Sequence, residues 1–135
     1  IIMEKEKYEG EARLGMLCIG AELMSMTGQL EETIKITGRV LSLNEKYSGI
    51  LSFTEVVQTK CYQARAYSDC GKWKDAIKSY KLLIREHKQH GVDPSNLILI
   101  DYSRALYELR KYDEALELGN MAIELNRSRP GYTSM

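Results

Sequence analysis

A seven-residue phrase recurs three times in the chain and constrains its fold more than any other feature. The copies read GQLEETI at 28–34, GKWKDAI at 71–77 and RKYDEAL at 110–116. Each copy reads as a tight turn, a bulky apolar residue, two charged residues and a small residue that opens an apolar helical face. Repetition at such spacings is typical of folds in which one small unit is stacked on copies of itself.

The composition favours an all-α fold. Two prolines and one phenylalanine are few for a β domain, whereas good helix formers such as Leu, Ala, Glu, Lys, Met and Arg are common throughout. The 19 basic residues balance the 19 acidic ones, so no overall field draws the chain to nucleic acid or to an anionic membrane. Binding must therefore depend on local surfaces.

Aligning the three phrases divides the chain into three helix pairs, with one helix before each phrase and one after it. The phrases lie 43 and 39 residues apart. We expect an α-solenoid of three antiparallel helix-turn-helix repeats at about 14–48, 52–90 and 94–126, followed by a tail at 127–135. The whole forms a single domain, which we expect to be a fragment of a larger protein because the chain begins with Ile rather than Met.

Helix starts and stops can be located from capping residues. Ser52 with Glu55 forms a capping box for the first helix of the middle unit, and Gly71 supplies the left-handed residue that ends it. In the third unit Asp93 is the expected cap, with Pro94 at the first helical position. The first unit is expected to be the least stable or a capping one, because Thr33, Thr37 and Gly38 are weak helix formers.

With these units defined, the chain resembles the tetratricopeptide repeat family over about residues 14–126. Small residues match the family where paired helices touch, at Ala21, Ala64, Ser103, Ala76 and Ala115, and aromatic residues match it at Tyr67, Trp73, Tyr80 and Tyr112. The repeats exceed the family's 34 residues and lack the proline that ends its second helices. The extra residues, around 44–51 and 87–93, lengthen second helices or loops. Lengthened repeats of this kind are loosely similar to those of kinesin light chain.

The resemblance implies a concave groove, lined by first helices, that binds a peptide or a helix of a partner. Carried over by alignment, the groove residues are Cys18, Glu22, Ser25, Met26, Cys61, Arg65, Ser68, Asp69, Ile100, Arg104, Tyr107 and Glu108. Arg65 and Arg104 are equivalent in consecutive units and can hold a carboxylate or phosphate together. Alternatively, each arginine pairs with the acidic residue four positions later, Asp69 or Glu108.

The groove positions also indicate which partner to expect. One branch of the family clamps chaperone tails with Lys and Asn, but Cys18, Cys61 and Ile100 stand at three of the corresponding places. A chaperone-tail function is therefore disfavoured. Apolar residues mixed with two arginines suit a partly hydrophobic acidic peptide or an amphipathic helix.

No sequence pattern for catalysis is present, so we expect no enzyme activity and no cofactor. His87 and His90 have the spacing of metal ligands on a helix, with Glu86 or Asp93 nearby, but a solvated helix end is the preferred interpretation. The three cysteines, Cys18, Cys61 and Cys70, are expected to be reduced and inert. The nine tyrosines fall mostly on packing positions, and without a basic stripe they do not predict RNA binding.

The sequence therefore predicts a non-catalytic interaction module, an adaptor or scaffold, that acts inside the cell and most simply in the cytoplasm. A partner protein or peptide is expected, with no nucleic acid and no membrane. Two alternatives stay open. One is a peptide- or ligand-sensing domain that regulates an attached signalling or transcription-control protein. The other is self-association, a homo-oligomer formed through the exposed ends of the repeats.

Overall fold

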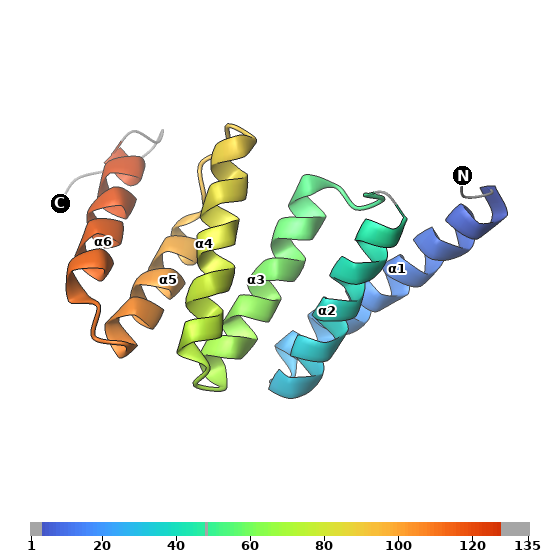
Figure 1. Cartoon of the computed structure of the whole chain (residues 1–135), viewed down its shortest axis with the longest axis horizontal. Helices are drawn as coiled ribbons and strands as arrows, with labels where there is room; N and C mark the ends of the chain where they lie inside the picture. The colour runs from blue at the N-terminus through green and yellow to red at the C-terminus, as the bar shows by residue number, and fades with distance from the viewer. Residues whose placement is uncertain (1–3, 48, 128–135) are drawn as a thin grey trace. The chain divides into compact units, whose positions relative to one another are not determined.

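The chain folds into consecutive α-helices (Figure 1). The structure is a computed structural model that describes residues 4–47 and 49–127, and in this part of the chain no strand occurs. The helices are α1 (Glu4–Met26), α2 (Leu30–Lys46), α3 (Phe53–Asp69), α4 (Trp73–Gln89), α5 (Asn96–Glu108) and α6 (Tyr112–Arg127). The prediction of an all-α fold is confirmed for these residues. None of the helices described is both long and apolar enough to cross a membrane.

Each recurring phrase lies at a three-residue connection between two helices, as predicted. The connections join α1 to α2, α3 to α4 and α5 to α6. At the same position of all three the backbone is left-handed, with φ of 72° at Gly28, 76° at Gly71 and 60° at Arg110. Glycine adopts this conformation without strain, whereas Arg110 carries a Cβ that disfavours it. The residues of the phrase therefore form the turn that ends one helix and starts the next.

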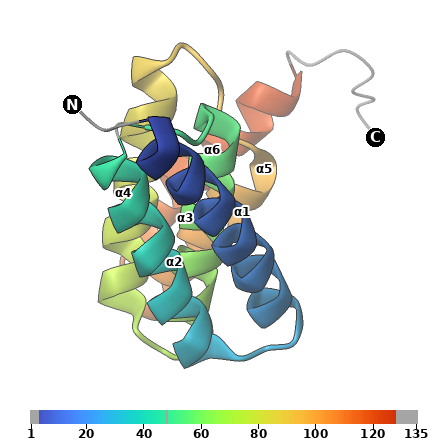
Figure 2. The ribbon, with the colours of Figure 1, turned by 90° about the vertical axis from the view of Figure 1, so that its right-hand side faces the viewer.

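The chain divides into two compact units, Ile1–Gly71 and Lys72–Met135, and the division falls at the second phrase. In the first unit α2 packs against both α1 and α3, and α1 also touches α3 (Figure 2). Leu14, Ala21 and Val40 are among its buried residues. The first predicted helix pair is confirmed as a packed pair.

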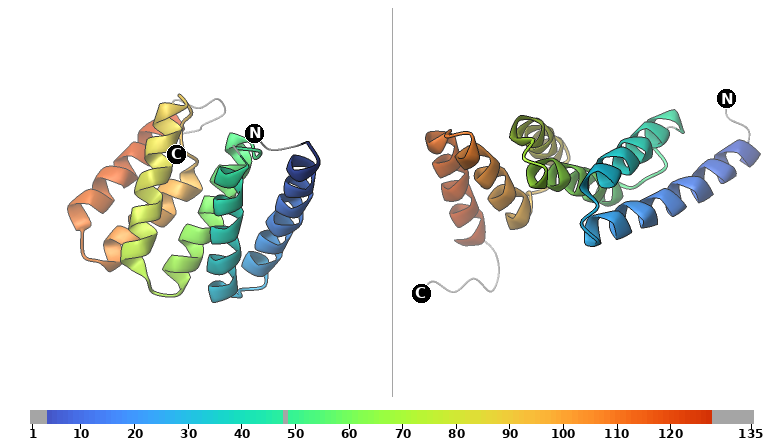
Figure 3. Two further views of the ribbon diagram at one scale, coloured as in Figure 1. Left: turned by 45° about the vertical axis from the view of Figure 1, so that its right-hand side comes forward. Right: turned by 90° about the horizontal axis from the view of Figure 1, so that it is seen from below.

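In the second unit α5 packs against both α4 and α6 (Figure 3). Leu83, Leu99 and Leu106 are fully buried. The rings of Tyr80 on α4 and Tyr102 on α5 are stacked, with centroids 5.7 Å apart. The helix pair of α5 and α6 is confirmed, while the pairing of α3 with α4 stays a prediction.

Helix α1 is longer than predicted and approaches α2 closely at two glycines. It begins at Glu4 rather than near Leu14. A Cβ at Gly10 would lie 2.9 Å from the ring of Tyr47, and a Cβ at Gly20 would lie 2.7 Å from Cδ1 of Ile36. Such distances are too short for any larger residue without a shift. Glycines in α1 therefore allow two bulky side chains of the α2 segment to pack directly on its backbone.

The threonines of α2 are buried rather than exposed, and their hydroxyl groups bond to the helix itself. Oγ1 of Thr33 donates to the carbonyl of Gln29 at 2.7 Å, and Oγ1 of Thr37 donates to that of Thr33 at 2.6 Å. A buried hydroxyl is costly only when it lacks a partner. Both hydroxyls have a partner here, so their burial does not carry this cost. The lower stability expected for this unit stays a prediction.

Two capping predictions have opposite outcomes. The box of Ser52 and Glu55 is formed in both directions, each bond measuring 3.2 Å. The predicted start of α5 at Asp93 and Pro94 is wrong, because the helix begins at Asn96 and the hydroxyl of Ser95 accepts the cap bond from the N–H of Ile98. Serine caps a helix as well as aspartate does, and the chain places Ser95 two residues further on.

The extra residues of the long repeats are divided between helix and loop. α2 continues to Lys46 and α4 to Gln89 before the chain leaves the helix. The first loop is tied back by Asn44, whose Oδ1 accepts a bond of 2.9 Å from the N–H of Leu51. In the second loop the N–H of Val92 donates to the carbonyl of His87 at 3.0 Å. Both loops are thus anchored on the preceding helix.

The left-handed position of the phrase predicts opposite effects for two substitutions. Gly71→Ala should lower the free energy of unfolding by about 1–2 kcal/mol, because alanine resists this conformation. Arg110→Gly should raise it by roughly 0.5–1 kcal/mol, because the strain of a non-glycine residue is removed. Chemical denaturation measures both changes. Lys111→Gly is the control, since its φ is not positive, and an equal gain there would contradict the explanation.

Candidate functional site

The predicted site residues of the first unit meet where α1 touches α3. Cys18 and Glu22 lie on α1, and Cys61 and Arg65 lie on α3. Burial raises the pKa of the Cys18 thiol above its ordinary value of 9.0, and the carboxylate of Glu55 on α3 raises it further. The structure thus brings the predicted residues of the two helices within electrostatic reach.

A tyrosine that the sequence reasoning missed lies at the centre of this face. Burial raises the pKa of Tyr62, as does the negative charge of Glu22 across the helix contact, whereas Arg65 acts in the opposite direction. Nε2 of Gln58 donates a hydrogen bond to the Tyr62 hydroxyl at 3.1 Å. We call Cys18, Glu22, Gln58, Cys61, Tyr62 and Arg65 the α1–α3 face. Gln58 and Tyr62 could have been identified from the sequence, because they lie one helical turn before Cys61 and Arg65 on α3.

The remaining predicted residues of this unit differ in their exposure. Met26 and Asp69 are exposed, each at the last residue of its helix. Ser25 is half-buried, while Ser68 is buried. The prediction that Ser68 presents its side chain to a bound segment is therefore wrong, because the hydroxyl has no access to one.

In the second unit the four predicted residues follow one exposed side of α5. Ile100 is 58% exposed and Tyr107 is 61% exposed, with Arg104 and Glu108 also exposed. Leu97 lies one turn before Ile100 and is exposed as well. We call Leu97, Ile100, Arg104, Tyr107 and Glu108 the α5 face. It combines apolar, aromatic and cationic side chains on one helix.

Aromatic rings from α4 and α6 support the α5 face. The guanidinium group of Arg104 lies over the ring of Trp73, with its central carbon 5.8 Å from the ring centroid. The ring of Tyr107 packs edge-on against that of Tyr112 at 5.4 Å. Arg104 is therefore held by an aromatic ring, and its pairing with Glu108 stays a prediction. Tyr112 was predicted to fill space between helices, yet it stays mostly exposed beside Tyr107.

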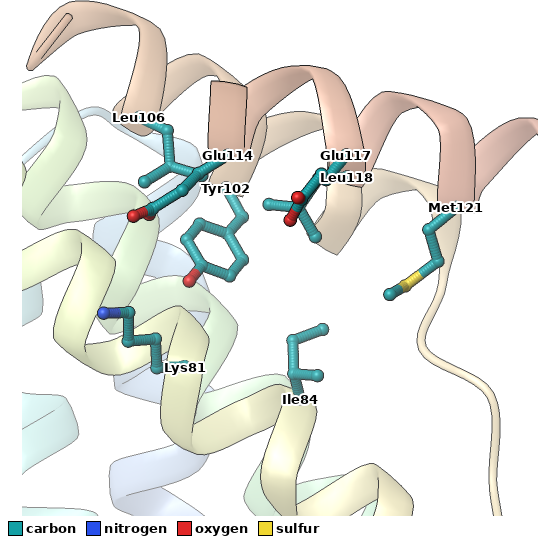
Figure 4. A pocket seen from close by; sticks show the side chains of 8 residues that line it. All are labelled: Lys81, Ile84, Tyr102, Leu106, Glu114, Glu117, Leu118 and Met121. Atoms are coloured by element: carbon teal, nitrogen blue, oxygen red, sulfur yellow. The ribbon is translucent and has the colours of Figure 1, made fainter. Parts of the chain in front are cut away.

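The second unit also contains a pocket of about 480 Å³ that the sequence reasoning did not predict (Figure 4). Its lining residues are Lys81, Ile84, Tyr102, Leu106, Glu114, Glu117, Leu118 and Met121, from α4, α5 and α6. Burial raises the pKa of Tyr102, and the carboxylate of Glu114 adds to the effect. Polar groups and apolar side chains thus face the same space.

Helix α4 carries a basic stripe, so the statement that the chain has none is wrong. The side chains of Lys74, Lys78, Lys81, Arg85 and Lys88 recur at intervals of four and three, and all are exposed. Three of these lysines and Lys111 surround Ile77 and Leu109. The balanced total charge concealed this local concentration. The stripe could have been identified from the sequence, because the basic residues of α4 have the same helical spacing as its apolar residues.

Only one of the two histidines lies at a solvated helix end, because His90 is the exposed C-cap residue of α4 and His87 is buried. His87 is only 5% exposed, and its Nδ1 is 2.7 Å from the carbonyl oxygen of Leu83. Nδ1 of the exposed His90 is 2.9 Å from the carbonyl oxygen of Glu86. Within the described residues, no three His, Cys, Asp or Glu side chains cluster closely enough to hold a metal ion. For His87, burial makes the solvated interpretation wrong.

The raised pKa of Cys18 predicts slow alkylation below pH 9. Because the thiolate is the reactive form, a pKa above 9.0 leaves less of it at such a pH. Glu55→Gln removes the second cause of the shift and should increase the iodoacetamide rate at Cys18 by about two- to threefold. Glutamine can still complete the capping box. Mass spectrometry gives the rate at Cys70 in the same samples as the control, and an unchanged Cys18 rate would contradict the role of Glu55.

Comparison with known proteins does not indicate what these surfaces bind. The chain matches no family model, no curated protein and no solved structure. The resemblance to the tetratricopeptide repeat therefore stays a prediction that rests on the three phrases and their spacing. Function has to be inferred from the chemistry of the two faces and the pocket.

Proposed function

We propose that the chain is a protein–protein interaction module built from three tetratricopeptide-like helix pairs, whose first helices present the binding surface. The recurring phrases at the three helix connections support the repeat. The α5 face is the single observation that carries the function. Its exposed Ile100, Arg104 and Tyr107 are of the apolar, arginine and aromatic kinds that contribute most to binding energy at interfaces.

The side chains of the α5 face are held in place before any partner binds. Trp73 supports the guanidinium of Arg104 from one side, and a cation over an aromatic ring keeps its hydrogen-bond donors available to a ligand. Tyr112 supports the ring of Tyr107 in the same way. Because ordering of long side chains opposes binding, a face that is already ordered binds more tightly.

The chemistry of the face indicates the partner. Leu97 and Ile100 offer about one turn of apolar surface, followed by the cation of Arg104. An amphipathic helix or extended peptide with apolar side chains and a carboxylate fits this order. On the first unit the α1–α3 face offers Arg65 beside Tyr62, a similar combination. Whether the two faces form one continuous groove stays a prediction.

Substitution of Arg104 tests this proposal. Peptides should first be selected from a random library on the whole chain, and their affinity for wild type and variants then measured by calorimetry. Arg104→Ala should weaken binding about tenfold or more, with Arg104→Lys losing less, because lysine keeps the charge but not the fork of donors. Arg85→Ala on the basic stripe of α4 is the matched control. Equal losses at both arginines would indicate a general charge effect, and no loss at Arg104 would reject the α5 face.

The pocket favours a second candidate function, a ligand-sensing domain. It has the size of a small-molecule site and joins an apolar wall to a few polar groups. Glu114 and Glu117 contribute two carboxylates to the pocket, and Lys81 contributes one amine. The ring of Tyr102 lies among these three side chains (Figure 4). This arrangement suits a small organic amine with an apolar group.

Thermal unfolding in the presence of a panel of aliphatic and aromatic amines tests the second candidate. A ligand of the pocket should raise the melting temperature with concentration, because it binds only the folded chain. Glu117→Gln should abolish the shift, and Asp113→Asn, which lies on the same helix outside the pocket, should leave it unchanged. A panel without any saturable shift would argue against this function.

A further inference from the structure

The first and last helices each expose an apolar stripe. On α1 the stripe is Ala12, Met16, Ile19, Leu23 and Met26, at intervals of four and three. On α6 it is Tyr112, Leu116, Gly119 and Ile123, with the same intervals. Such spacing places the side chains in one line along a helix and is typical of a helix–helix seam. No charged residue interrupts either line.

The stripe of α1 is large for a surface that meets only water. Met16 is 75% exposed and Leu23 is 54% exposed. Ile19, which lies between them, and Met26, at the end of the helix, are also exposed. These four side chains present on the order of 500 Å² of apolar surface, which is at the upper end for a patch on a monomer. A standard interface needs about 800 Å² from each partner, so the stripe supplies much of one.

Two positions of this stripe, Met16 and Leu23, have buried equivalents in the later first helices. By the spacing of the phrases, Met16 corresponds to Thr59 of α3 and Ile98 of α5, and both are buried. Likewise, Leu23 corresponds to Ala66 and Ala105, which are also buried. The same face of α3 and α5 is therefore covered, whereas that of α1 is open.

The cover on α3 and α5 is the second helix that precedes each of them. α2 packs on α3, and a Cβ at Gly38 of α2 would touch the side chain of Gln63, which lies between Thr59 and Ala66 on that face. α4 packs on α5, and Tyr80 stacks on Tyr102, which lies between Ile98 and Ala105. The open stripe of α1 is thus shaped to receive a second helix.

Helix α6 is a second helix with the matching face open. Its Leu116 is 65% exposed, whereas the equivalent Ile77 of α4 is buried. Gly119 stands where α4 has Tyr80 and α2 has Thr37, both buried. A Cβ at Gly119 would meet nothing within 4 Å, so nothing within the described chain requires a glycine there. Since a helical glycine costs about 1 kcal/mol relative to alanine, its presence indicates room left for another group.

The side chains of the α1 stripe can adapt to the face of α6. Methionine adapts its shape to irregular gaps, and Met16 and Met26 are the most exposed large residues of the stripe. Gly119 leaves space on α6 that such side chains can fill.

We propose that α6 of one copy of this chain docks on α1 of a second copy and repeats the contacts of α2 on α3 and of α4 on α5. The interface is head-to-tail, so each copy keeps one open face and further copies can be added. The occupant of the α1 stripe is thus a second copy of this chain. The proposal uses neither the α5 face nor the pocket and stands apart from the proposed function.

Two substitutions and their mixture test this inference. Leu23→Glu places a charge in the α1 stripe, and Leu116→Glu places one in the α6 stripe. Sedimentation velocity from micromolar to millimolar concentration should show association of the wild type, weakened at least about tenfold in each variant. Leu82→Glu on α4, an exposed leucine outside both stripes, is the matched control and should associate as the wild type does. Both changed residues are exposed, so circular dichroism and thermal unfolding should stay near wild type.

The mixture of the two variants distinguishes this interface from others. Each variant damages only one of the two faces, so the mixture retains one intact pair and should form a dimer that cannot grow. Association lost only in Leu23→Glu would mean that α1 pairs with α1, and association lost only in Leu116→Glu that α6 pairs with α6. Either result, a mixture that stays monomeric, or a wild type that is monomeric throughout overturns the proposal.

Discussion

The reversal of the chain at a left-handed residue is the constraint on which the rest of the structure depends. Gly28, Gly71 and Arg110 each end one helix within a single residue and leave only three residues before the next. Within the units, so short a connection makes α2 run back along α1 and α6 run back along α5. The buried face between α1 and α2 and that between α5 and α6 follow from this reversal, because it sets which side of each helix meets its neighbour.

The sequence predicted the helix pairs better than the details at their ends. The phrase at 28–34, 71–77 and 110–116 located the turns because its pattern repeats and needs no tertiary information. The cap of α5 was missed because Asp93 and Ser95 are both good caps, and local preference could not choose between them. The early start of α1 was missed because its packing on Tyr47 depends on glycine at position 10, which no helix propensity favours.

The candidate site was predictable as a set of exposed positions on first helices, but its chemistry was not. Alignment located Ile100, Arg104 and Tyr107, and all three lie on one exposed side of α5. The support of Arg104 by Trp73 depends on contacts between helices, which a linear pattern does not contain. The pocket at Tyr102 was missed for the same reason, since its walls come from three helices. The basic stripe of α4 was legible in the sequence and was hidden only by the balance of total charge.

Contacts between helices in each unit join elements that are adjacent or nearly adjacent along the chain. Such local topology lowers the entropy lost when contacts form, so it favours rapid folding. Protection of backbone amides against hydrogen exchange should then vary along the chain, because a helix with one neighbour opens at a lower cost than a helix with two. In the second unit, α5 contacts both α4 and α6 and becomes the slowly exchanging centre, whereas each helix of the first unit has two neighbours. A protease should therefore cut within α6, which has one neighbour in its unit, before it cuts within α5.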